Sequence, residues 1–179
     1  IRTATYFSNK ELHPSTEAYQ KNGQAWGRTN LKGELRHNFY KPGKEFGAQM
    51  CLRSGWLDFL KFSIDRVLKN HPLDGVYYDW NVSLLCYNAR HEGGGEAASP
   101  GRGHWDVDEL VDLMEWTRRR VGPGGVIIVH NTTTPMFVAE NFSDYVVATE
   151  WGYGKWTDRA PDLENLPLEW TFAGAVPRG

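Results

Sequence analysis

Hydrophobic and polar positions along this chain alternate in a way that predicts strands separated by helices. The segment 73–80, Leu-Asp-Gly-Val-Tyr-Tyr-Asp-Trp, is a turn followed by a short strand rich in β-branched and aromatic residues. Apolar residues recur at helical spacing before it, over 54–70, and after it, from residue 106 to about 121. Strands that alternate with amphipathic helices are typical of a parallel sheet covered by helices.

The rest of the chain continues this alternation. A strand over 1–7 and a helix that begins at the N-cap Thr16 and ends near Trp26 form a first βα unit. Residues 27–53 contain several glycines and only weak alternation, which predicts a long loop with a small hairpin around 35–40. Further predicted elements are strands at 126–131, 144–149 and 168–172 and a short helix at 135–140.

We therefore expect residues 1–179 to form a single domain of the α/β class, in which a parallel β-sheet with alternating helices forms part or all of a TIM (β/α)8 barrel. A complete barrel takes about 250 residues, so an excerpt with open sheet edges, and self-association through those edges, are expected. An open doubly wound sheet is the alternative, although no Gly-rich nucleotide fingerprint follows any strand. We expect the long loop insertion at 81–105 to be a lid or wall over a site.

Composition narrows the classes of partner. The net charge is −2, which favours neither nucleic acid nor an anionic membrane. No apolar run approaches the about 20 residues of a membrane span and no signal peptide opens the sequence, so we expect a soluble protein. Aromatic residues make up 13% of the chain and include eight Trp. Several of these Trp fall in predicted loops, where their faces can stack on sugar rings.

Two further patterns predict structural roles. Asp106 and Glu109 have the spacing of a capping box, so both carboxylates are expected to cap the helix that follows Asp106. Cys51 and Cys86 are far apart in the sequence and form no paired metal or redox motif. We expect two buried free thiols, no bound metal and no cofactor.

Carboxylates stand where two of the predicted strands end. Asp79 and Glu150 each follow an apolar strand and precede a Trp, and His130 and Asn131 end the strand between them. Because the C-terminal ends of parallel strands meet at one edge of a sheet, we expect the two carboxylates to face one cleft. Such a pair cleaves glycosidic bonds: one carboxylate attacks or stabilises the anomeric carbon, and the other protonates the leaving oxygen and later deprotonates water.

The shorter and more exposed Asp79 suits the nucleophile. Glu150 suits the acid/base, because its aromatic neighbours would raise its pKa. The expected substrate-binding residues are polar or aromatic side chains beside these two carboxylates: Trp80, His130, Asn131, Trp151 and Tyr153. Each also has a purely structural interpretation, because strand ends need polar partners and tryptophans pack beneath loops.

The segment 74–79, Asp-Gly-Val-Tyr-Tyr-Asp, resembles the fourth-strand segment of (β/α)8 glycoside hydrolases such as the α-galactosidases and α-glucosidases. The resemblance covers residues 73–151 and implies that Asp79 is the nucleophile and Glu150 the acid/base. This chain departs from that family because the sixth-strand acid there is commonly Asp and because the early strands are missing here. In the hexosaminidases Asp and Glu are adjacent, whereas Trp80 follows Asp79, which disfavours substrate-assisted cleavage.

Two other classes of function stay open at this point. A non-catalytic carbohydrate-binding module, or an inactive barrel fragment, would use the same aromatic platforms and polar strand ends. A metal-dependent TIM-barrel hydrolase would use strand-end His and Asp residues. Its candidate ligands, which show no His-x-His or other paired spacing, are Cys86, His91, His104 and His130.

Overall fold

The structure, a computed structural model, describes residues 1–91, 102–130 and 136–147. Within these ranges four parallel strands form the main sheet, in the order β1-β5-β8-β9. The strands are β1 (Ala4–Ser8), β5 (Gly75–Asp79), β8 (Val126–His130) and β9 (Tyr145–Val147). The α-helices are α1 (Glu17–Trp26), α2 (Gly55–Asn70), α3 (Val107–Val121) and α4 (Phe137–Glu140).

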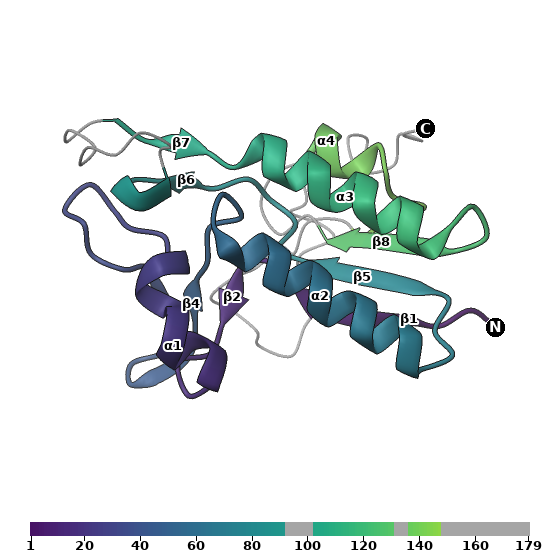
Figure 1. The fold of residues 1–179 in the computed structure, drawn as a ribbon, viewed down its shortest axis with the longest axis horizontal. Helices are drawn as coiled ribbons and strands as arrows, with labels where there is room; N and C mark the ends of the chain where they lie inside the picture. The colour runs from purple at the N-terminus through teal and green to yellow at the C-terminus, as the bar shows by residue number, and fades with distance from the viewer. Residues whose placement is uncertain (92–101, 131–135, 148–179) are drawn as a thin grey trace, which may run out of the picture.

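The main sheet confirms the predicted α/β fold with a parallel sheet and alternating helices. Each of its strands pairs with the previous one along the chain, which is the order found in a (β/α) barrel. Helices α2 and α3 lie across one face of the sheet (Figure 1). In the part of the chain that the structure describes, β1 and β9 are the two edge strands, and self-association through them stays a prediction. None of the described helices is long and apolar enough to cross a membrane.

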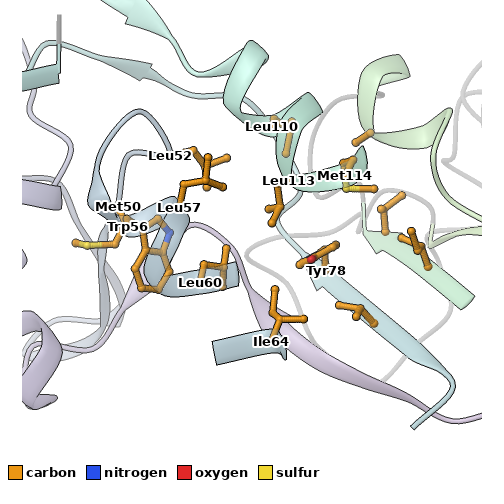
Figure 2. Packing of buried hydrophobic residues seen from close by; sticks show 14 of the residues in the cluster. Met50, Leu52, Trp56, Leu57, Leu60, Ile64, Tyr78, Leu110, Leu113 and Met114 are labelled. Carbon is orange, nitrogen blue, oxygen red and sulfur yellow. The ribbon is translucent and has the colours of Figure 1, made fainter. Parts of the chain in front are cut away.

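The core lies between this sheet and the two long helices (Figure 2). Ser54 caps α2 as predicted, because its hydroxyl accepts a hydrogen bond from the backbone N–H of Trp56. Tyr78, fully buried in β5, points into the core and bonds the hydroxyl of Thr117 on α3 at 2.7 Å. The strand therefore shows its even positions to the helices and its odd positions, Tyr77 and Asp79, to the opposite face.

Two small antiparallel sheets gather at the end of the main sheet where β5 and β8 finish (Figure 1). One has the order β2-β4-β3, and the other pairs β6 with β7. Their strands are β2 (Glu11–Leu12), β3 (His37–Lys41), β4 (Lys44–Gln49), β6 (Leu85–Cys86) and β7 (His104–Trp105), and a 3-10 turn, η1 (Ala89–His91), lies between the last two.

The prediction of a long loop over residues 27–53 is thus partly wrong. Its hairpin turns at Gly43, whose φ of 75° suits glycine, and β4 also pairs with β2. The sequence signal was weak because β4 contains Gly47 and Ala48, which have low strand propensity, and pairing on both sides compensates for it.

The predicted capping box is also wrong. Asp106 starts α3, but its side chain makes no cap hydrogen bond, and Glu109 pairs with Arg53 at 2.9 Å. The Asp106 carboxylate is instead fully buried and lies 2.9 Å from Nζ of Lys10, which is also fully buried. Burial raises the pKa of Asp106, but Lys10 and two backbone N–H donors outweigh it, so the net shift is downward. The Asp106 carboxylate therefore accepts hydrogen bonds from Lys10 and from the backbone N–H groups of Leu52 and Leu84, and not from the first turn of α3.

Candidate functional site

Asp79 is the last residue of β5, and both neighbouring strands hold its carboxylate. The hydroxyl of Tyr6, on β1, donates to Oδ2 at 2.8 Å, and Nδ1 of His130, on β8, lies 2.7 Å from Oδ1. The backbone N–H of Trp80 also donates to Oδ1, at 2.9 Å. The Asp79 side chain is still 24% exposed. A carboxylate that is oriented by several donors and open to solvent can act as a nucleophile or a base.

The partners of Asp79 share one face of the sheet. The ring centroids of Tyr6 and Tyr77 lie 5.6 Å apart, edge to face, and those of Tyr77 and His130 lie 6.4 Å apart. This is the face that α2 and α3 do not cover, and it corresponds to the interior face of a (β/α) barrel. Nε2 of His130 is buried and has no hydrogen-bond partner among the described residues. The His130 ring therefore holds Asp79 with Nδ1, while its other nitrogen lies in the interior.

Trp80 has a left-handed backbone conformation, with φ of 52°. No other non-glycine residue in the described ranges has a positive φ. Such a conformation costs a bulky side chain about 1–3 kcal/mol, and strained residues of this kind gather at functional sites. The turn places the N–H of Trp80 on the Asp79 carboxylate, so the strain is coupled to the orientation of that group.

Glu11 is a further acidic residue at this end of the sheet, and it was not predicted from the sequence. It lies on β2, three residues after the end of β1, and accepts a hydrogen bond from the side chain of Asn38. Burial, helped by the charge of Asp79 and opposed by the Asn38 bond, raises the pKa of Glu11 to about 7. A carboxyl group with such a pKa can donate a proton near neutral pH. Its closeness to the end of a strand was the only signal in the sequence.

The pKa of the Tyr6 phenol is also raised, first by partial burial and then by its hydrogen bond to Asp79. The charge of Glu11 adds to this shift. Tyr6 therefore stays protonated and remains a donor to Asp79 throughout the physiological range.

Glu150, Trp151, Tyr153 and Asn131 lie outside the described residues, so their predicted roles stay predictions. Strand β9 runs parallel to β8 and ends at Val147, three positions before Glu150 in the sequence.

The residues considered for a metal-dependent hydrolase separate into two places. His130 belongs to the Asp79 site, whereas Cys86, His91 and His104 meet Cys51 in a buried group. Both cysteines are free and buried, as predicted. Cys51, Cys86, His91 and His104 have no paired spacing in the sequence, so the sequence did not predict that they would lie together.

The sequence of this chain was compared with protein families and with curated proteins. The model of a family described as "Domain of unknown function (DUF6259)" matches residues 1–165. A search of curated proteins finds no match.

Several solved structures are similar to this chain in fold. An α-N-acetylgalactosaminidase from Bifidobacterium bifidum is 12% identical with a TM-score of 0.57, over 90% of this chain and 23% of that one. An α-galactosidase from Thermus thermophilus, in complex with stachyose, is 11% identical with a TM-score of 0.54, over 82% and 28%. The glycoside hydrolase domain of PelA from Pseudomonas aeruginosa is 15% identical with a TM-score of 0.54, over 96% and 62%.

These likenesses show the fold alone: this chain is similar in fold to part of each of these glycoside hydrolases, as the sequence resemblance implied. The chain spans about a quarter of the length of the first two proteins and 62% of the PelA domain.

Proposed function

We propose that this chain, which belongs to the family described as "Domain of unknown function (DUF6259)", is part of a glycoside hydrolase whose nucleophile is Asp79. The observation that carries the proposal is the position of the Asp79 carboxylate. It ends a central strand, is held by Tyr6 and His130 from the two flanking strands, and remains partly exposed. The similarity of the fold to glycoside hydrolases supports the proposal.

The proposed reaction uses Asp79 and Glu150 in two steps. Asp79 attacks the anomeric carbon while the bond to the leaving oxygen breaks, and Glu150 gives that oxygen its proton. Glu150 then takes a proton from the water that displaces Asp79, which releases the sugar and restores both carboxyl groups. This mechanism retains the anomeric configuration and needs carboxyl groups about 5–5.5 Å apart. Glu11 is a second candidate for the acid, because its pKa of about 7 suits proton donation.

We propose an α-linked glycoside as the substrate class. Two of the structures with a similar fold are an α-galactosidase and an α-N-acetylgalactosaminidase by name. On the face of the sheet that carries Asp79, Tyr6 and Tyr77 offer aromatic surface to a sugar ring. We expect Trp80 to complete this sugar platform.

Carbohydrate binding without catalysis is the competing function, because the same groups would serve it equally well. A metal-dependent hydrolase is disfavoured at Asp79. The group of potential metal ligands found in the described part of the chain contains neither Asp79 nor His130.

The test is a screen of the protein against aryl α- and β-glycosides, with Asp79→Asn and Glu150→Gln beside it. We expect turnover of an α-glycoside, lost by about 10³-fold or more in Asp79→Asn, while calorimetry shows that the variant still binds the sugar. The matched control is Asp74→Asn, an exposed carboxylate at the opposite end of the same strand, which should keep full activity. Binding without turnover by the unmodified protein would favour the binding module, and full turnover by Asp79→Asn would refute the assigned role.

A further inference from the structure

Four potential metal ligands from separate parts of the chain meet in the interior. One ligand atom from each of Cys51, Cys86, His91 and His104 lies within 4.8 Å of all the others, and all four residues are buried. Cys51 follows β4, Cys86 ends β6, His91 ends η1 and His104 begins β7. The pairing of β6 with β7 sets Cys86 directly opposite His104.

The distances within this group match those of a tetrahedral site. Sγ of Cys51 lies 3.4 Å from Nε2 of His104, and Sγ of Cys86 lies 3.5 Å from Nδ1 of His91. Zinc bonds of about 2.3 Å to sulfur and about 2.0–2.1 Å to nitrogen place such sulfur and nitrogen atoms about 3.6 Å apart in a tetrahedron. Two cysteines and two histidines are also one of the ligand sets that structural zinc sites use.

The surroundings orient the ligands further. Nε2 of His91 lies 2.7 Å from the carbonyl oxygen of Ala25, which fixes the proton on Nε2 and leaves Nδ1 free to face Cys86. The backbone N–H of Asn88 donates to Sγ of Cys86 at 3.4 Å. Nδ1 of His104 is buried and has no partner among the described residues, and Nε2 of the same ring faces Cys51.

Cys51 and Cys86 are the two thiols of this group. A dication would favour the thiolate form of both, because each thiol must release its proton to solvent when it binds a metal.

We propose that Cys51, Cys86, His91 and His104 bind one Zn²⁺ in a structural site with four protein ligands. Four protein ligands close the coordination shell, so this zinc would hold structure and would not activate water. It would fasten the segment that carries Cys86, His91 and His104, which begins two residues after Asp79, to the corner between β4 and α2. The site is independent of the proposed glycosidase chemistry, because within the described residues the hydrogen bonds of its ligands involve neither Asp79 nor its partners Tyr6 and His130.

The first test is the metal content of the protein, purified without a histidine tag and under reducing conditions. We expect one zinc per chain by elemental mass spectrometry after dialysis. Replacement by Co²⁺ should give the visible d–d bands of tetrahedral coordination together with a thiolate charge-transfer band. Removal of the zinc with a strong chelator should lower the melting temperature.

Variants separate the four ligands from other histidines. Cys86→Ser and His91→Gln should lose the zinc, whereas His71→Gln, at an exposed position after α2, should keep it. Asp79→Asn should also keep the zinc even if it loses activity. The proposal is overturned if the unmodified protein carries no metal and binds neither Zn²⁺ nor Co²⁺, or if its two cysteines prove to be joined in a disulfide. It is equally overturned if both ligand variants retain one zinc. If those variants do not fold, the measurements on the unmodified protein decide the question.

Discussion

Nδ1 of His130 and Oδ1 of Asp79 lie 2.7 Å apart, between the last residues of two neighbouring parallel strands. The His130 ring is 6% exposed and the Asp79 side chain 24%, so the imidazole supports the carboxylate from inside while the carboxylate meets solvent. This arrangement makes His130 a positioning residue for Asp79. A hydrogen bond of this kind fixes the direction of attack, and small misplacements of a reacting group are costly in rate.

Replacement of His130 should separate positioning from packing. We expect His130→Ala to lower kcat by about 10–100-fold, because Asp79 loses a donor and gains freedom to rotate. His130→Asn should recover much of this loss, since its amide nitrogen can occupy the place of Nδ1. Steady-state kinetics on the best glycoside of the screen would measure both, with circular dichroism as the control for folding. Equal kcat values for the two variants would show that the hydrogen bond does not matter.

The left-handed backbone of Trp80 should reverse the usual order of alanine and glycine. We expect Trp80→Gly to have a larger free energy of unfolding than Trp80→Ala, by about 1 kcal/mol, because glycine has no Cβ to oppose a φ of 52°. The same pair of substitutions at Trp105, on strand β7, should show the normal order, with alanine more stable. Urea unfolding measures all four variants, and a more stable Trp80→Ala would contradict the strain at this position.

The buried Lys10–Asp106 ion pair should dominate the stability of this end of the fold. Asp106→Asn leaves a charged ammonium buried without its counter-ion, so we expect a loss of about 3–5 kcal/mol in the free energy of unfolding. Asp112→Asn is the control, because the Lys61–Asp112 pair has the same chemistry at the surface, and its loss should stay below about 1 kcal/mol. Chemical denaturation at neutral pH compares the two. Similar losses would mean that burial does not set the importance of the pair.

Glu11 should make the protein less stable as the pH rises. Its pKa is about 7 in the fold and 4.5 for an ordinary glutamate, so between these values the folded state holds a proton that the unfolded state has released. Raising the pH from 5 to 8 therefore favours unfolding. Glu11→Gln removes this effect, so its melting temperature should rise relative to that of the unmodified protein across the same interval. The control is Glu17→Gln at an exposed position, whose melting temperature should not rise relative to that of the unmodified protein over this interval. If Glu11→Gln behaves like this control, the prediction for Glu11 is wrong.

The local pattern of the sequence was enough to predict the main sheet and helices. Apolar residues recur with a period of two in strands and 3.6 in helices, and this period is visible within a few consecutive residues. The strand that ends at Asp79 and the helices around it could therefore be identified directly. The position of Asp79 at the C-terminal edge followed from the same pattern, because a parallel sheet brings all its strand ends to one side. The capping box failed since a local motif competed with a distant partner, Lys10.

Tertiary structure decided which distant polar groups meet. Cys51 and His104 touch across 53 positions of sequence, so no local spacing could reveal this contact. The shared strand ends predicted that His130 lies near Asp79, and the structure shows that Nδ1 of His130 faces Oδ1 of Asp79. The pKa of Glu11 likewise depends on burial and on the charge of Asp79, which strand packing brings near. Sequence periodicity determines which face of a helix or strand is apolar. The packing of those apolar faces determines which polar residues come close together in space. The strand-end residues Asp79 and His130 were therefore visible in the sequence, and the cysteine–histidine group became visible only in the fold.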